Sequence, residues 1–204
     1  AGLGVISRKY HIPIYATRRT IEAIKQYDKL GKIDEELYHE IMPDTTFSIK
    51  NIVIEAGSTW HDAADPVCYN FIGDNKKVSI ATDLGDYDDY IVDKICGSDI
   101  LFIEANHDIN MLQVGSYPYY LKQRILGNKG HLSNERAGML IKKVLNDHLD
   151  AVILGHLSKE NNYPDLAYET VKLELADNTY SNDVRDFNLQ VAKRDDTSAV
   201  IIAS

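Results

Sequence analysis

Residues 133–155 read SNERAGMLIKKVLNDHLDAVILG and predict a helix followed directly by a strand. Ser133 is a favourable capping residue, and apolar side chains then recur at 137, 140, 141, 144 and 145, with His148 about one turn further on. This spacing places them on one face of a helix over 133–149. The run Ala151–Gly155 is short and continuously apolar, as is typical of a strand buried on both faces. We therefore expect the apolar face of this helix to pack against a sheet that contains the strand.

The segments on either side predict further strands and helices. Short runs of β-branched or aromatic residues, separated by Gly, Asn and Asp, predict strands at 47–55, 67–72, 78–83, 99–104, 171–176, 187–194 and 199–203, with a hairpin turn at 73–75. Helical spacing predicts helices at 1–10, 17–30, 33–42, an interrupted 111–126 and part of 164–171. Because the chain has no repeat and no linker-like stretch, we expect one α/β (or α+β) layered domain over 1–204.

The composition is that of an ordinary globular protein and narrows the classes of function. The chain has 204 residues, 44% hydrophobic and 26% charged, which suffices for a substantial core. Cys68 and Cys96 are too few for a disulfide framework or a thiolate zinc site, so we expect a reducing, cytoplasmic location. No apolar run is long enough to cross a membrane. The net charge of −9 disfavours non-specific attraction to polyanions and anionic membranes but does not exclude local basic patches.

Four segments place histidines and acidic residues where loops on a rigid sheet commonly hold functional groups. They are the loop 59–67 with His61, the strand exit 80–86 with Asp83, the strand exit 102–108 with Glu104, Asn106 and His107, and the near-repeats 130–135 and 155–160 with His131 and His156. Taken singly, each has a structural explanation, because an Asp after a strand often caps a turn and a lone His is often only hydrogen bonded. In 80–86, Gly85 is expected to let the backbone turn away after Asp83.

His61, Asp83 and His156 together favour a different interpretation. Each stands at a predicted strand exit, and imidazole and carboxylate are the ligands that hard-to-borderline divalent cations prefer. We therefore predict a metal site formed by these three residues. The alternative is that each makes only local hydrogen bonds.

Several longer motifs occur in order along nearly the whole chain. They are HDAADPV at 61–67, ATDLG at 81–85, EANHDINML at 104–112, YPYYLKQRILG at 117–127, GHLSNE at 130–135 and LGHLSKENN at 154–162. In these motifs and their order the chain resembles the YycJ (WalJ) type of metallo-β-lactamase-fold hydrolase. The resemblance implies part of an αββα sandwich with metal ions at one edge of its two packed sheets.

The resemblance also implies roles for individual residues. His61 looks like a ligand of one metal ion, Asp83 like the carboxylate that bridges two ions, and His156 like the last ligand of the second ion. Two divalent ions (Zn, Mn or Fe) would activate water and polarise the bond that it attacks. By analogy with ribonuclease Z-like relatives, His131 is the candidate general acid and Glu104 its orienting partner. The alternative role of this pair is to support the metal ligands.

For the substrate, the resemblance implies a phosphodiester in DNA or RNA. Lys122 and Arg124, beside Asn106 and His107, form a local basic cluster suited to phosphate contacts, although a solvated surface is an equally good explanation. A metal-dependent nuclease of exonuclease type is the leading interpretation. A small-molecule hydrolase on the same fold is the alternative, because the same metal chemistry would serve a thioester, a lactone or a small phosphodiester.

One part of the family pattern is not found. Members of the family carry a His-x-His-x-Asp-His motif upstream of the segment that here begins at Ala1, and no His-x-His occurs in the 204 residues. We therefore expect the C-terminal portion of a longer hydrolase, without its N-terminal strands, with partial or no metal occupancy and inactive by itself. A further alternative is that the chain acts only by association, forming homo-oligomers through uncovered sheet or helix faces.

Overall fold

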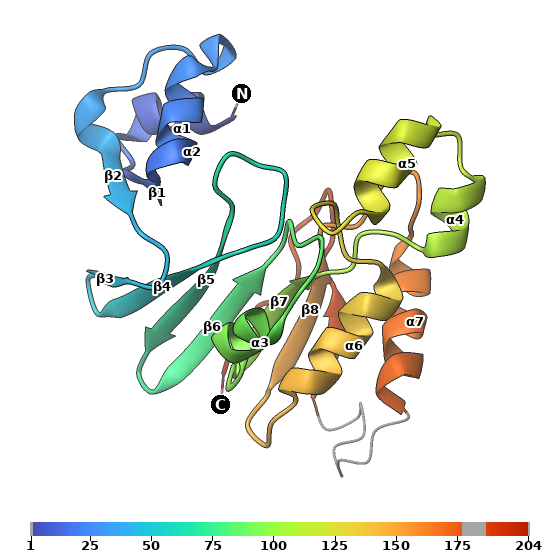
Figure 1. Cartoon of the computed structure of the whole chain (residues 1–204). Coiled ribbons are helices and arrows are strands. Elements are labelled where there is room, and N and C mark those ends of the chain that lie inside the picture. Colours follow the sequence, from blue (N-terminus) through green and yellow to red (C-terminus); the bar gives the residue numbers. More distant parts are fainter. Residues whose placement is uncertain (1, 177–186, 204) are drawn as a thin grey trace.

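A seven-stranded sheet forms the centre of the computed structural model, which describes residues 2–176 and 187–203 (Figure 1). Ala1, the first residue of the predicted N-terminal helix, lies outside the described residues. In spatial order the strands are β3 (Thr46–Ile49), β4 (Ile52–Ser58), β5 (Val67–Gly73), β6 (Lys76–Ala81), β7 (Ile100–Glu104), β8 (Ala151–Gly155) and β9 (Asn188–Val191). Strands β3 to β6 pair antiparallel, whereas β6 to β9 pair parallel.

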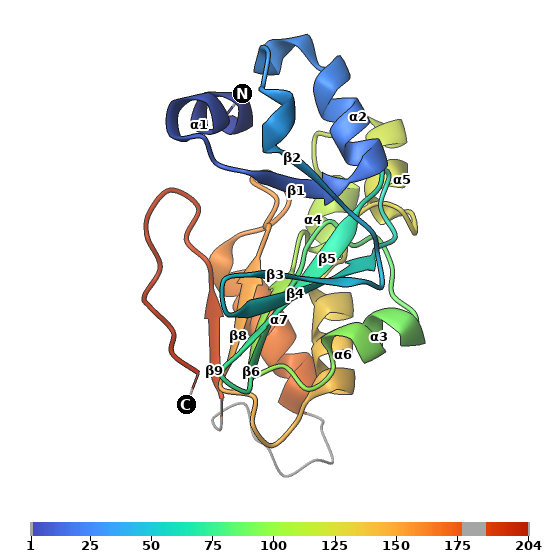
Figure 2. The ribbon, with the colours of Figure 1, turned by 90° about the vertical axis from the view of Figure 1, so that its left-hand side faces the viewer.

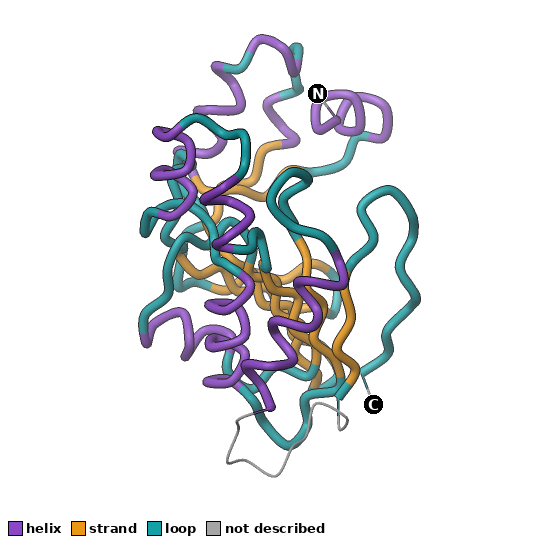
Figure 3. The backbone as a smooth tube through the Cα atoms, turned by 90° about the vertical axis from the view of Figure 1, so that its right-hand side faces the viewer, coloured by secondary structure: helices purple, strands orange, loops and turns teal. Residues whose placement is uncertain are grey.

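Three helices cover one face of this sheet. They are α3 (Asp89–Ile95), α6 (Asn134–Val144) and α7 (Pro164–Ala176), and Figures 2 and 3 show them on the same side of the strands. Leu101 and Ile103 of β7 and Leu154 of β8 meet Leu140 and Ile141 of α6 in one fully buried cluster. Burial of each such side chain contributes about 1.5–3 kcal/mol. The prediction that the helix at 133–149 packs on a sheet containing 151–155 is confirmed.

The end of α6 differs from the prediction. The helix ends at Val144, and His148 is exposed rather than part of the buried face. The Asn146 side chain explains the difference, because its amide donates to the Ser98 carbonyl at 3.1 Å and its oxygen accepts from the His148 backbone at 3.1 Å. These contacts compete with a further helical turn.

The predicted helix at 33–42 is wrong. This segment forms the 3₁₀ turn η2 (Glu35–Leu37) and the strand β2 (Tyr38–Ile41), which pairs parallel with β1 (Ile14–Thr17). Ile33 and Leu37 are buried against Ile14 of β1. Pairing with a distant strand therefore overrides the local helical spacing.

The predicted strand at 171–176 is also wrong, because these residues form the second half of α7. Val171, Leu173 and Leu175 alternate with polar residues, which suits a strand, but only two of them face the core. Val171 and Leu175, four residues apart, are 0% and 3% exposed, whereas Leu173 is 72% exposed. A spacing of four is that of a helical face.

The predicted strand at 199–203 is not formed either, and Val200 and Ile202 are exposed. The predicted strand at 47–55 is divided by a turn at Lys50, which has a φ of 55°, into β3 and β4. The hairpin at 73–75 is confirmed, since Asp74 and Asn75 have φ values of 52° and 60°, as a type I′ turn requires.

The remaining elements flank the sheet. At the N-terminal end, α1 (Gly2–Tyr10), β1, α2 (Arg18–Gln26), the 3₁₀ turn η1 (Asp28–Leu30) and η2 lead to β2. After β7, the predicted interrupted helix is found as α4 (Ile109–Val114) and α5 (Tyr119–Leu126). The helix α3 was not predicted. None of the described helices is both long and apolar enough to cross a bilayer.

One edge of the sheet is the expected position of a functional site. Because β6, β7 and β8 run parallel, their carboxyl ends meet there, and β4 points the same way. This is the edge at which open sheets of this kind commonly bind ligands. The predicted mixed α/β layered fold is confirmed, while the absence of N-terminal strands stays a prediction.

Candidate metal centre

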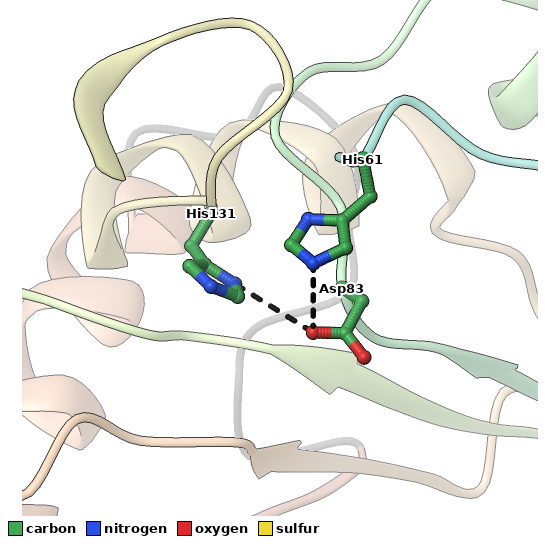
Figure 4. A group of neighbouring side chains, drawn as sticks. All are labelled: His61, Asp83 and His131. Atoms are coloured by element: carbon green, nitrogen blue, oxygen red, sulfur yellow. Dashed lines mark ion pairs between the residues drawn. The ribbon is translucent and has the colours of Figure 1, made fainter. Parts of the chain in front are cut away.

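The three predicted ligands converge at this edge of the sheet. His61 comes from the loop between β4 and β5, Asp83 follows β6, and His156 follows β8. Oδ1 of Asp83 lies 3.5 Å from Nε2 of His61 and 3.7 Å from Nε2 of His156. Figure 4 shows the Asp83 carboxylate below the rings of His61 and His131.

These distances fit a divalent ion. They are long for hydrogen bonds, but they match the spacing of about 3.4 Å between two ligand atoms that each lie about 2.1 Å from a tetrahedral zinc ion. His61, Asp83 and His131 form one group whose ligand atoms lie within 4.8 Å of one another, and Glu104, His131 and His156 form a second. His131 belongs to both groups, so the trio predicted from the sequence is spread over the two groups rather than forming one of them.

A backbone contact fixes the ring of His61, one of the predicted ligands. Its Nδ1 lies 2.8 Å from the carbonyl oxygen of Gly130, which can only accept a hydrogen bond. Nδ1 must therefore carry the proton, and Nε2, which faces Asp83, keeps its lone pair for a metal ion. Such an outer hydrogen bond is typical of metal-binding histidines.

Glu104 organises the two other histidines. Its side chain is fully buried, and its Oε1 lies 2.6 Å from Nδ1 of His131 and 3.1 Å from Nδ1 of His156. Its Oε2 accepts from the Leu84 backbone at 2.7 Å. Burial alone would raise the pKa of Glu104, but the hydrogen bonds from the two histidines outweigh it and hold this pKa below the ordinary value. Glu104 is therefore an ionised acceptor that fixes both rings.

The contact with Glu104 leaves each histidine with one free ring nitrogen. In His156 this is Nε2, which faces Asp83, and the same contact raises the pKa of the His156 imidazole. In His131 it is also Nε2, because Nδ1 is held by Glu104. The His131 ring lies between those of His61 and His156, with centroid separations of 4.8 and 5.2 Å. His131 can therefore present a ring nitrogen to a molecule bound at this edge.

Two site residues have left-handed backbones. Asp83 and His156 have φ values of 55° and 56°, which non-glycine residues seldom adopt. Such conformations cost about 1–3 kcal/mol and persist where the surrounding structure fixes them. The backbone bends at Gly85, as expected, although Gly85 has no left-handed φ. Gly85 also allows a close approach, because a Cβ on it would lie 2.4 Å from the nitrogen of Gly130.

The predicted substrate residues do not form one basic cluster. The Lys122 ammonium lies 2.7 and 2.6 Å from the carbonyl oxygens of Gln113 and Gly115, so it joins α4 to α5. Arg124 makes a two-pronged contact with Asp62, at 2.5 and 2.9 Å. Since Asp62 adjoins His61, Arg124 supports the loop of a metal ligand.

The other two predicted substrate residues are buried. The Asn106 amide donates to the His156 carbonyl at 2.9 Å and so holds the loop after β8. His107 is 1% exposed and lies beside His131 along a cavity. Sequence reasoning missed Asn162, whose amide donates to the carbonyls of Ala105 and Asn106 at 2.9 and 3.1 Å. Its place at the end of the motif LGHLSKENN was the available signal.

Comparison with known proteins gives the family of the chain. The sequence model described as "Beta-lactamase superfamily domain" matches residues 1–157. The chain belongs to the beta-lactamase superfamily. All three predicted ligands and the pair Glu104 and His131 lie within the matched region.

Curated relatives within the superfamily confirm the resemblance to the YycJ (WalJ) type. The chain is 40% identical over 179 residues to a protein named Exodeoxyribonuclease WalJ from Streptococcus pneumoniae serotype 2. It is 36% identical over 176 residues to Exodeoxyribonuclease YycJ from Bacillus anthracis. These matches cover 86% and 85% of this chain, which spans 65% of the length of each relative.

Solved structures share the fold. The Zn(2+)-bound PqqB of Methylobacterium extorquens superposes with a TM-score of 0.60 at 14% identity, over 93% of this chain and 66% of that protein. At this identity the likeness concerns the metallo-β-lactamase fold alone.

Proposed function

We propose that this superfamily chain carries part of the di-metal site of a DNA phosphodiesterase of exonuclease type. One observation carries the proposal: the Asp83 carboxylate lies between two imidazoles, beside a second imidazole–carboxylate pair. The names of the two curated relatives support DNA as the substrate.

The residues of the chain have separate proposed roles at the site. His61, Asp83 and His156 would hold the divalent ions, for which zinc and manganese are both suitable. When bound, such ions activate water and polarise the phosphodiester. Glu104 fixes the ring of His131 through the 2.6 Å hydrogen bond. His131 can then donate a proton from its other ring nitrogen to the oxygen that leaves the phosphorus.

The net charge of the chain favours DNA binding at the metal site over non-specific binding to the rest of its surface. With a net charge of −9, attraction to DNA away from the site is weak. Affinity for a strand is therefore expected to depend on the metal ions, which offset the carboxylates of Asp83 and Glu104. This dependence gives a test that does not require turnover.

The test measures binding of a fluorescent single-stranded DNA by anisotropy, with and without Mn²⁺. We expect Mn²⁺ to increase the affinity of the unaltered chain by tenfold or more and to have no such effect on Asp83→Asn. Release of nucleotides from end-labelled DNA is followed in the same samples, with the chain in excess. A chain that binds Mn²⁺ but gains no affinity for DNA would contradict the proposal, and cleavage of a small phosphodiester or thioester alone would favour the small-molecule alternative.

The inactivity of the isolated chain stays a prediction. Three ligand residues are proposed here for two ions, so we expect fewer than two tightly bound ions per chain and little or no hydrolysis. Nucleotide release at the rate of an efficient exonuclease would contradict this expectation.

A further inference from the structure

A cavity of 330 Å³ lies beside the candidate metal centre. It is bounded by the loop after β6, the segment after β7 and the beginning of α6, and His131 lines it. Nδ1 of His131 also lies 3.9 Å from Asp83 Oδ1. A molecule in this cavity therefore lies next to the proposed site of bond cleavage.

His107 is a buried polar residue in the wall of this cavity. The ring is 1% exposed, and among the described residues neither of its nitrogens has a hydrogen-bond partner. Its backbone is fixed, because the His107 carbonyl accepts from the Asn134 nitrogen at 2.9 Å. Burial lowers the pKa of the imidazole to about 4, so the ring is neutral at physiological pH and offers one N–H donor and one acceptor. A buried polar group without a partner costs about 1–3 kcal/mol, which a bound ligand would recover.

The cavity lies at the beginning of α6, whose first turn also carries the acidic Glu135. Ser133, which lines the cavity, caps this helix by accepting from the Arg136 nitrogen at 3.3 Å, and α6 is 11 residues long. The amino end of a helix carries a partial positive charge and binds phosphate well. The Arg136 guanidinium also lines the cavity, where it pairs with Asp86 and lies 5.0 Å from the centre of the Tyr87 ring.

The rest of the lining is mixed, because Asn128 is polar and the other members include two apolar side chains. Ile109 and Leu126 border the cavity together with Gly85. The volume exceeds that needed for a phosphate ion alone and lies at the lower end of the range for small-molecule sites. Apolar walls beside a polar end suit the sugar and base of a nucleotide.

We propose that this cavity binds a phosphate-bearing nucleotide of the DNA strand, with the phosphate held by His107, Arg136 and the amino end of α6. The inference rests on the proposed function and adds a position for the nucleotide next to the cleaved bond. Asp86 neutralises Arg136 and opposes the phosphate charge, so removing its carboxylate is expected to strengthen phosphate binding.

The test is an NMR titration of the 204-residue chain in EDTA, which separates the cavity from metal binding. The probes are thymidine 5′-monophosphate, thymidine 3′-monophosphate, thymidine and inorganic phosphate. We expect the ring signals of His107 to shift with at least one monophosphate, and thymidine and inorganic phosphate to bind at least tenfold more weakly. Equal binding of inorganic phosphate would indicate a simple anion site and overturn the nucleotide assignment.

Variants assign the binding to named groups. His107→Phe keeps the ring volume, and we expect it to weaken the monophosphate about tenfold without lowering the melting temperature, because no internal hydrogen bond is lost. The matched control is His148→Phe, an exposed histidine beyond the other end of α6. Arg136→Gln should also weaken binding, whereas Asp86→Asn should strengthen it. Unchanged affinity in both His107→Phe and Arg136→Gln, or weaker binding in Asp86→Asn, would overturn the proposal.

The two proposals fail separately. Monophosphate binding in EDTA without Mn²⁺-dependent DNA binding would keep the cavity assignment as a nucleotide site and contradict the exonuclease proposal. Mn²⁺-dependent DNA binding without any monophosphate in the cavity would keep the exonuclease proposal and contradict the assignment of the cavity as a nucleotide site.

Discussion

Asp83 and His156 pair a strained backbone with side chains that point toward one another. Each follows a parallel strand and has a φ near 55°, and the Asp83 carboxylate faces the Nε2 atoms of His61 and His156. A residue in this conformation costs free energy that only its surroundings can offset. The same backbone conformation occurs in the turns at Lys50 and Asp74, so the functional prediction for Asp83 and His156 rests on their converging side chains.

His131 and the metal ligands are expected to respond differently to substitution. In His131→Gln, the ions keep His61, Asp83 and His156, so the metal content should stay within twofold of the unaltered chain. In a longer form of the protein that hydrolyses DNA, loss of the proton donor should slow the reaction by about 10²–10⁴-fold. Metal analysis after dialysis and a DNA hydrolysis assay measure the two effects. Loss of metal together with activity would give His131 the role of a ligand or support instead.

At the scale of the elements, strand exits were predictable because the parallel strands are short and apolar. The runs that became β6, β7 and β8 carry their polar residues immediately after the last apolar one, which located Asp83, Glu104 and His156 correctly at the sheet edge. Contacts between distant segments were not predictable in this way. The unpartnered ring of His107 and the pairing of Arg124 with Asp62 depend on how loops meet in the folded chain.

The segment 171–176 shows why alternation alone can mislead. Its apolar residues fit a strand, but packing on α6 selects the helix, in which Leu173 faces solvent. We expect Leu175→Ala to lower the free energy of unfolding by about 2–4 kcal/mol, because it opens a space in the core. Leu173→Ala, the matched control on the same helix, should change it by less than about 0.5 kcal/mol. Urea denaturation measures both, and equal effects would contradict the helical assignment.

A second prediction at this scale concerns the link between β4 and α3. Lys94 Nζ lies 2.6 Å from Glu55 Oε1, and this hydrogen bond holds the pKa of Glu55 below its ordinary value of 4.5. A lowered folded pKa means that the stabilisation is complete above the ordinary pKa and is lost as the pH falls through the folded pKa.

Glu55→Gln should therefore lose about 1–2 kcal/mol at pH 7 and show a weaker pH dependence of stability below the ordinary carboxyl pKa. Denaturation at a series of pH values measures this difference. The exposed Glu40→Gln in β2 is the control. A Glu55→Gln profile parallel to that of the unaltered chain over this acid range would contradict the assignment.

At the scale of the whole molecule, α3, α6 and α7 cover one face of the sheet in the part of the chain that the structure describes. On the other face, Ile80 pairs with Phe102, and Phe102 with Ile153, to form an apolar row across three central strands. Ile80 is 36% exposed, and the other two are partly exposed. Contiguous exposed apolar surface of this kind is typical of an interface.

We expect the chain to self-associate through this row at micromolar concentrations and to bind a hydrophobic dye. Ile80→Lys should shift the species seen by light scattering toward the monomer and reduce the dye fluorescence. Met139→Lys, on the solvent side of α6, is the control and should change neither. A monomer at all concentrations, without dye binding, would contradict association through this face.

The most direct measurement is the binding of Mn²⁺ and Zn²⁺ to the 204-residue chain, by calorimetry and by metal analysis after dialysis. With Asp83 as the shared ligand, Asp83→Ala should weaken binding of either ion by at least tenfold, while Asp93→Asn, an exposed carboxylate on α3, leaves it unchanged. Equal affinities of the unaltered chain and Asp83→Ala would contradict a metal centre at this edge of the sheet.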